Sequence, residues 1–126
     1  MDAQLIAKYA KHDTKTLKEL AQKKFNAFIR KRDENCLCIS CGKNPIQQAG
    51  HYYAAGKYNG LRFHEDNVHG QCIHCNYYEH GNLIKYRINL EQKIGRDRLA
   101  ELDSKATKKA IKNDRFLYIE VIEKYK

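Results

Sequence analysis

Residues 67–80 read NVHGQCIHCNYYEH and hold two cysteines, three histidines and two asparagines in fourteen positions. Within them Cys72 and Cys75 form a Cys-x-x-Cys pair, and a second such pair, Cys38 and Cys41, precedes it by a spacer of thirty residues. Two of these pairs supply four thiolates, which is the ligand set of a tetrahedral structural zinc ion. The sequence therefore predicts one closed zinc site that ties two distant segments of the chain together.

The cysteine content also bears on where the protein works. The chain shows no apolar run long enough to span a membrane and no signal-peptide pattern at its start, so we expect a cytoplasmic protein without membrane contact. Cytosolic thiols stay reduced, which favours metal ligation over disulfides and leaves Cys36 as an unassigned fifth cysteine. Neither pair follows a βαβ pattern, which argues against a thioredoxin-like redox site.

The composition indicates a small core and a polyanionic partner. The 126 residues include 24 Lys and Arg against 15 Asp and Glu, a net charge of +9. A chain of this size buries only a modest core, so a bound zinc would add to its folding free energy. The positive charge favours nucleic acid, because neutralising phosphates releases condensed counterions. An ordinary basic surface is the alternative.

The spacing of apolar residues predicts a mainly helical α+β fold. A helix is expected over residues 16–35, with Thr16 and Glu19 as a capping box. Its apolar face comprises Leu17, Leu20, Ala21, Phe25, Phe28 and Ile29. Further helices are expected over residues 72–82, 82–95, 96–113 and 115–126, the last with a pattern that also permits a strand. In the helix over residues 82–95 the candidate packing residues are Leu83, Ile84, Tyr86, Leu90 and Ile94, with Gly95 as the stop.

A β-hairpin is expected between the two cysteine pairs, in the segment from Cys41 to Cys72. HYYAA, residues 51–55, and LRFHE, residues 61–65, are strand candidates, and the glycine-bounded GKYNG joins them. His51 would open the first strand and Asn67 would follow the second. Asn76 comes directly after the second cysteine pair.

This order resembles the HNH endonucleases of the His-Me finger (ββα-metal) group. Those enzymes carry a His on the first strand, an Asn after the second, and a His or Asn on the following helix, where this chain has His51, Asn67 and Asn76. The family spacing N-x4-C-x2-C-[HN] is also met. A narrower resemblance, over residues 15–102, is to the NinG/Rap recombination endonucleases of lambdoid phages. It rests on the segments FNAFIRKRD, CISCG, AGHYYAAG, LRFHEDNVHGQC, CNYYEHGN and YRINLEQKIG.

The resemblance implies divalent-metal-dependent cleavage of branched DNA, including Holliday junctions and D-loops, during phage recombination. It implies three segments folded together as one domain: an N-terminal helical segment over residues 1–35, a zinc-stapled HNH ββα core over residues 36–82 and a C-terminal helical extension over residues 83–126. DNA would be the partner, with phage or host recombination proteins as further candidates. A homodimer would supply the two active sites that symmetric cleavage of a four-way junction needs.

The resemblance also implies roles for single residues. His51 would be the general base, since an ordinary imidazole pKa of about 6.5 suits proton transfer at neutral pH. Asn67 would orient His51 by hydrogen-bonding backbone across the hairpin. Asn76 would offer its amide oxygen to Mg²⁺ or Mn²⁺, and His80, one helical turn later, would be a second ligand, a phosphate contact or a solvated side chain. Many HNH enzymes carry Asp or His before the base, but this chain has Gly50, so water and DNA phosphate would complete the coordination.

Basic and aromatic side chains near these residues are candidate DNA contacts. Arg62 would reach the scissile phosphate or form a structural salt bridge, and Lys85 and Arg87 would follow the DNA backbone or remain solvated. The local tyrosines would stack on unpaired bases or pack in the core: Tyr52, Tyr53, Tyr58, Tyr77 and Tyr78. Surface or loop roles are expected for His64, His69 and His74.

Two other classes of function stay open. A non-catalytic, zinc-stapled nucleic-acid-binding module explains the charge and the cysteines, but leaves His51, Asn67 and Asn76 as coincidence. A zinc-stabilised protein-interaction domain explains neither the charge nor those three residues. Cleavage that requires both Mg²⁺ and His51 would separate a nuclease from both alternatives.

Overall fold

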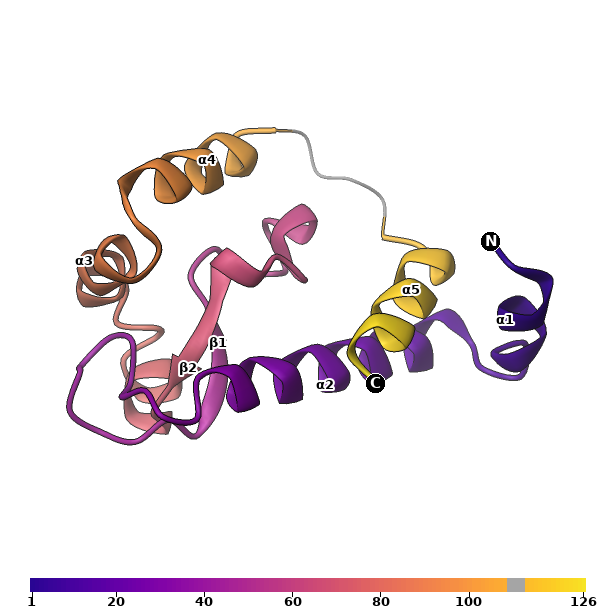
Figure 1. Cartoon of the computed structure of the whole chain (residues 1–126), viewed down its shortest axis with the longest axis horizontal. Coiled ribbons are helices and arrows are strands. Elements are labelled where there is room, and N and C mark those ends of the chain that lie inside the picture. Colours follow the sequence, from indigo (N-terminus) through magenta and orange to yellow (C-terminus); the bar gives the residue numbers. More distant parts are fainter. Residues whose placement is uncertain (109–112) are drawn as a thin grey trace.

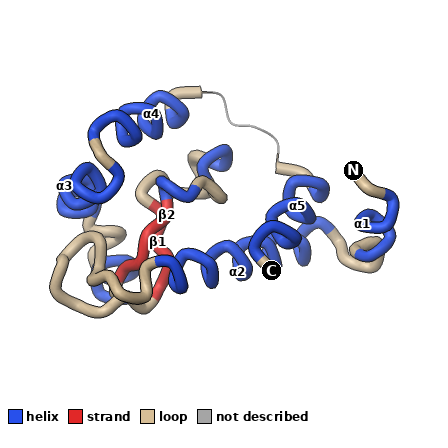
Figure 2. Tube along the Cα trace, viewed as in Figure 1, coloured by secondary structure: helices blue, strands red, loops and turns tan. Residues whose placement is uncertain are grey.

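The computed structural model describes residues 1–108 and 113–126 (Figure 1). Its helices are α1 Ala3–Lys8, α2 Thr14–Arg32, α3 Leu83–Ile94, α4 Arg96–Ala106 and α5 Arg115–Tyr125. Its strands are β1 Gln48–His51 and β2 Val68–Gln71, with 3₁₀ turns η1 Asn59–Leu61 and η2 Glu65–Asn67 and a short π-helical turn η3 His74–Tyr78. Helix dominates, and within the described part of the chain the only sheet is this strand pair (Figure 2). This confirms a mainly helical fold with a small sheet.

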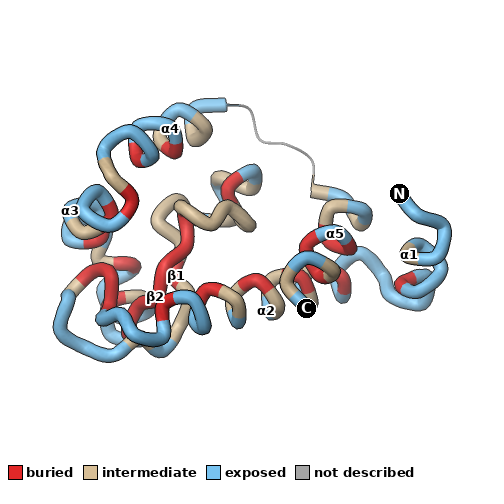
Figure 3. The backbone as a smooth tube through the Cα atoms, viewed as in Figure 1, coloured by how far each residue is buried: buried red, intermediate tan, exposed pale blue. Residues whose placement is uncertain are grey.

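The larger apolar core lies where α5 packs on α2 (Figure 1). The predicted apolar face of α2 faces this core, with Leu17, Ala21, Phe25 and Ile29 buried and Leu20 and Phe28 partly buried (Figure 3). The Phe25 ring meets the ring of Tyr125 edge-on at 5.0 Å between centroids, a favoured aromatic geometry. The expected helix over residues 115–126 is therefore confirmed as α5.

The beginning of α2 differs from the predicted capping box. The helix starts two residues earlier than expected, and Asp13 is its N-cap. The Asp13 carboxylate accepts from the backbone N–H of Thr16 at 2.8 Å, so Thr16 receives the cap interaction instead of supplying one. An N-cap side chain satisfies one of the free N–H groups of the first turn, and once Asp13 does so the Thr16–Glu19 box has no function.

A second apolar cluster lies between α3, α4 and the turns near η1. It comprises Ile39, Leu61, Tyr86, Leu90, Ile94, Leu99 and Leu102. Three of the five packing residues predicted for α3 belong to it, but Leu83 and Ile84 are 44% and 82% exposed, so that part of the prediction is wrong. Both stand in the first turn of α3, before its first buried residue, Tyr86. Gly95, at φ 89°, ends α3 as predicted.

The hairpin strands are not where the aromatic segments predicted them. β1 and β2 pair antiparallel, with His51 opposite Val68. His51 therefore ends the first strand instead of opening it. The rest of residues 51–55 and all of residues 61–65 lie in the connection between the strands.

The Asn67 side chain explains why the first strand stops. Its amide oxygen accepts from the backbone N–H of Tyr53 at 2.8 Å, and its amide nitrogen donates to the Tyr53 carbonyl at 3.0 Å. A strand can continue only if its main-chain groups are free to pair with a neighbour. Both main-chain groups of Tyr53 are already bonded, so the segment turns away as a loop.

Two further helix predictions need adjustment. The helix expected over residues 72–82 is shorter, because η3 ends at Tyr78 and the backbone turns left-handed at His80, Gly81 and Asn82. The helix expected over residues 96–113 is present as α4 as far as Ala106, and residues 109–112 lie outside the described part of the chain. None of the described helices combines the length and apolar character that a bilayer span requires. The division into three segments stays a prediction.

Candidate functional site

The four predicted cysteines come together. The sulfur atoms of Cys38, Cys41, Cys72 and Cys75 all lie within 4.8 Å of one another, and three of the four side chains are buried. A tetrahedral zinc ion with bonds of about 2.3 Å holds its sulfurs about 3.8 Å apart, so this donor set fits zinc with a small contraction. Cys36 is exposed and lies outside the cluster. All four positions are thiols, so an ion held here would have its four positions filled by the protein, as in a structural site.

Two asparagines that the sequence reading did not single out support the cluster. The amide nitrogen of Asn44 lies 3.5 Å from the Cys72 sulfur, and that of Asn82 lies 3.5 Å from the Cys75 sulfur. Hydrogen-bond donors of this kind stabilise thiolates and orient them toward a metal. Asn44 follows Cys41 by three residues and Asn82 follows Cys75 by seven, and this proximity is the only sequence signal they carry.

His51 stands half-buried at the end of β1, and one of its ring nitrogens is held. Its Nε2 lies 2.9 Å from the main-chain carbonyl of Arg62. A carbonyl only accepts, so Nε2 carries the proton and Nδ1 carries a lone pair. Burial lowers the pKa of the imidazole and outweighs the hydrogen bond to the Arg62 carbonyl, which raises it; the Arg62 guanidinium charge lowers it by a smaller amount. The ring is therefore neutral at pH 7, the state that a general base requires.

Asn67 is completely buried and joins the two ends of the loop that holds His51. Besides its two bonds to Tyr53, its amide nitrogen donates to the carbonyl of Leu61 at 3.0 Å. Leu61 directly precedes Arg62, whose carbonyl accepts from His51. The predicted backbone contact of Asn67 near His51 is thus present, although it acts through the loop after β1.

Asn76 lies on η3, above the first strand. Its amide nitrogen donates to Gln48 Oε1 at 2.8 Å. Its Oδ1 faces Gly50, at 3.1 Å from the point where a Cβ on that glycine would lie. Gly50 directly precedes His51, so the structure brings Asn76 to the neighbourhood of the candidate base. An amide oxygen there suits a hard divalent cation.

The helical-turn argument for His80 is wrong. η3 ends at Tyr78, and His80 has a left-handed φ of 50°. Asn76 and His80 therefore do not stand one helical turn apart on a common face. His80 is exposed, and a role for it stays a prediction.

The candidate DNA contacts have different surroundings. Arg62 lies in a turn rather than on a strand, and its Nη1 donates to Gln22 Oε1 at 3.3 Å. Arg87 forms an ion pair with Asp103 at 2.7 Å and lies over the ring of Tyr52, so its charge is already partly matched. Lys85 is exposed.

A buried ionic network below the hairpin was missed. The Asp33 carboxylate is almost completely buried and accepts from Arg32, from Lys93 and from the backbone N–H of Gly70. Burial alone would raise the pKa of that carboxyl, but these donors hold it well below its usual range. His69, expected to be a surface or loop residue, is buried here. It is hydrogen-bonded at both ring nitrogens, by Arg32 and to a backbone carbonyl, so unlike His51 it has no free lone pair.

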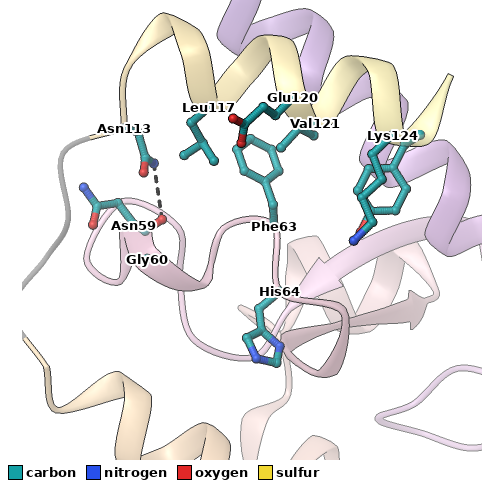
Figure 4. Close-up of a pocket in the computed structure, with 10 residues that line it drawn as sticks. Asn59, Gly60, Phe63, His64, Asn113, Leu117, Glu120, Val121 and Lys124 are labelled. Atoms are coloured by element: carbon teal, nitrogen blue, oxygen red, sulfur yellow. Dashed lines mark hydrogen bonds between the residues drawn. The ribbon is translucent and has the colours of Figure 1, made fainter. Parts of the chain in front are cut away.

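A separate cavity of about 300 Å³ lies between the 59–64 turns and α5 (Figure 4). Phe63, Leu117 and Val121 give it an apolar lining. The side-chain amide nitrogen of Asn113 donates to the main-chain carbonyl of Asn59 at 3.2 Å (Figure 4). None of the predicted catalytic or metal-binding residues lines this cavity. It therefore does not belong to the candidate site around the first strand.

Comparison with known proteins identifies the family. The family model described as "Bacteriophage Lambda NinG protein" matches residues 2–126, beyond the span of the sequence resemblance at both ends. "Protein ninG" of Escherichia phage lambda is 45% identical over 86 residues, which are 67% of this chain and 42% of the relative. The proteins of the same name from Salmonella phage P22 and Enterobacteria phage H19B are 45% and 44% identical over the same length.

The matched part is only about two fifths of these relatives: 42% for phage lambda and phage P22, and 43% for phage H19B. No solved structure matches the chain significantly. The printed names state no activity. Since the family model covers nearly every residue, the chain belongs to the bacteriophage lambda NinG family.

Proposed function

We propose that this chain is an HNH-type, divalent-metal-dependent endodeoxyribonuclease that hydrolyses phosphodiester bonds in branched DNA. The observation that carries the proposal is the hydrogen bond from His51 Nε2 to the Arg62 carbonyl. It leaves a half-buried, neutral imidazole whose pKa is lowered and whose Nδ1 has no hydrogen-bond partner among the described residues. A neutral, oriented histidine beside amide oxygens is the arrangement that metal-assisted hydrolysis needs.

In the proposed reaction, His51 Nδ1 takes a proton from a water molecule as its oxygen bonds to phosphorus. The bond from phosphorus to the 3′-oxygen breaks, and that oxygen takes up a proton from solvent. A bound Mg²⁺ or Mn²⁺ would supply charge stabilisation for the phosphate and the leaving oxygen. Asn76 would hold this ion through Oδ1, and Asn67 keeps His51 in register through the loop.

The net charge of the chain and the aromatic groups near the site both suit DNA. The chain has a net charge of +9, which favours phosphate binding. Tyr77 and Tyr78 follow Asn76 and are 69% and 66% exposed. Exposed aromatic rings stack on unpaired bases without sequence preference, which supports a branched substrate. Tyr52, in contrast, packs on the α3–α4 cluster.

The test compares wild type with His51→Ala on labelled four-way, D-loop, flap and linear DNA, in Mg²⁺ or EDTA. His74→Ala is the matched control, because His74 lies on η3, the turn that carries Asn76, and its side chain is 65% exposed. Wild type and the control are expected to cut branched DNA only with Mg²⁺. His51→Ala is expected to bind DNA but cut at least about 100-fold more slowly, the usual contribution of a general base.

Zinc content and circular dichroism of every variant are measured in the same preparations. A folded, zinc-loaded wild type that binds branched DNA but cuts none with any divalent metal would favour the non-catalytic binding module. Equal cutting by His51→Ala and wild type would remove His51 from the mechanism. The preferred DNA structure, a second subunit and recombination partners stay predictions from the resemblance.

A further inference from the structure

Gln71, the last residue of β2, has an amide oxygen without a hydrogen-bond partner among the described residues. The side chain is fully buried, and its Nε2 donates to Ser40 Oγ and to the Gly81 carbonyl, both at 2.8 Å. A carbonyl only accepts, so the bond to Gly81 sets which end of the amide is the nitrogen. The Oε1 atom is consequently left facing Gly50, buried and unpaired.

Gly50 is the residue that makes room for this oxygen. A Cβ built on Gly50 would overlap Gln71 Oε1 and would lie 3.1 Å from Asn76 Oδ1. Two amide oxygens from different elements therefore converge on one side of Gly50, next to His51. Gly50 needs to be a glycine because of this space, since its φ is not in the left-handed range.

Two converging acceptors, of which Gln71 Oε1 has no donor among the described residues, indicate a missing positive group. A buried acceptor left unpaired costs about 1–3 kcal/mol, and two oxygens that face the same space also repel each other. A hard divalent cation relieves both effects, because Mg²⁺, Mn²⁺ and Ca²⁺ take neutral amide oxygens as ligands. Asn76 is only half-buried, so its side of the site is open toward solvent.

We propose that Gln71 Oε1 and Asn76 Oδ1 together ligate a divalent cation, with Gln71 occupying the space that the side chain of residue 50 would otherwise fill. The zinc cluster helps to position this pair: Gly81, which anchors the Gln71 amide, also donates its N–H to the carbonyl of Cys75 at 2.8 Å. Both ligands are neutral, so the ion binds weakly to the free protein and more tightly when a DNA phosphate joins it. The proposal rests on the proposed function for the purpose of the ion, but its test does not require cleavage.

The first measurement uses the zinc-loaded full chain without DNA. Mn²⁺ is added while the side-chain amide NMR signals are followed, because a bound paramagnetic ion broadens only nearby nuclei. The signals of Gln71 and Asn76 are expected to disappear first, and the exposed Gln92 is the internal control. If the Gln71 signal survives when electron paramagnetic resonance shows the protein to be saturated with Mn²⁺, the proposal is wrong.

The second measurement changes the space at residue 50. Gly50→Ala pushes the Gln71 amide away and is expected to weaken Mn²⁺ binding at least 10-fold. Gly56→Ala is the matched control, since a Cβ there meets nothing within 4 Å. The double variant Gly50→Asp with Gln71→Ala places a carboxylate in the vacated space and is expected to restore binding. Unchanged Mn²⁺ affinity in folded Gly50→Ala would overturn the proposal.

The cation site and the nuclease can fail separately. If Mn²⁺ broadens the Gln71 amide signal but no divalent metal supports DNA cleavage, the cation-site proposal stands and the nuclease proposal is wrong. If cleavage needs both Mg²⁺ and His51 but the Gln71 signal is not broadened, the nuclease proposal stands and Gln71 is not a ligand.

Discussion

His51 Nε2 donates to the main-chain carbonyl of Arg62 at 2.9 Å, and this bond selects which ring nitrogen is free. The residue before Arg62 helps to hold this carbonyl in place. Asn67 donates to the carbonyl of that residue, Leu61, as well as to the carbonyl of Tyr53. One buried side chain thus holds two points of the loop that follows the candidate base. The arrangement gives predictions for stability and for activity.

Asn67→Asp is expected to disrupt this loop. The substitution keeps the shape but replaces an N–H donor by an oxygen that faces the carbonyls of Tyr53 and Leu61. Loss of buried hydrogen bonds of this kind costs about 2 kcal/mol or more. Urea unfolding of the zinc-loaded variant should show this loss, and cleavage should fall with it. Asn35→Asp, at an exposed position, should unfold like wild type; if Asn67→Asp does so too, the loop role of Asn67 is refuted.

The pH dependence of cleavage should follow His51. The active form of a general base is unprotonated, and burial lowers the His51 pKa from its ordinary 6.5. The single-turnover rate at saturating Mg²⁺ is therefore expected to rise with pH through a midpoint below 6.5 and then to level off. Arg62→Gln removes a nearby positive charge and should move the midpoint upward. A midpoint above 6.5 in wild type would contradict the assignment.

His69 should make the protein sensitive to acid. Burial, then the charges of Lys93 and Arg32, lower its pKa from 6.5 to about 3, while Asp33 and the bond to the Asp66 carbonyl oppose this. Between these values the unfolded chain binds a proton that the folded protein does not, so stability falls as pH falls below 6.5. This one group contributes about 1.4 kcal/mol per pH unit.

The acid effect is measured as the difference in unfolding free energy between pH 7 and pH 5. His69→Gln should be less stable than wild type at pH 7 but should lose less on going to pH 5. Protonation of the cysteine cluster affects both proteins alike and cancels in the comparison. Parallel losses in the two proteins would show that His69 does not carry the effect.

Zinc should be part of the fold. The four thiols join the 38–41 loop to the end of the hairpin, and in a small chain such a metal contributes directly to folding free energy. Metal analysis is expected to find one zinc per chain. Cys72→Ser should lose it and unfold at lower urea, as should wild type after chelation. Cys36→Ser should retain zinc, because Cys36 lies outside the cluster; loss of zinc there would contradict the four-cysteine assignment.

Features that depend on local spacing could be predicted from the sequence. A helix repeats every 3.6 residues, so the buried stripe of α2 and the helical state of α5 are visible in the order of apolar residues. Paired cysteines are similarly informative, because two residues between them suit a shared metal. The helix start was missed, since Asp13 and Thr16 are both good capping residues and only the backbone conformation distinguishes them.

The sequence by itself therefore determined the longer helices α2, α3, α4 and α5, the four-cysteine set and the positions of His51, Asn67 and Asn76 as candidates. Only the tertiary structure decided where the strands lie, because strand pairing joins distant residues and Asn67 occupies the main-chain groups of Tyr53. The tertiary structure alone also decided which ring nitrogen of His51 carries the proton, since this depends on the Arg62 carbonyl, eleven residues away in the chain. The convergence of Gln71 on Gly50 has the same origin: two strands bring together atoms whose distance no local spacing encodes.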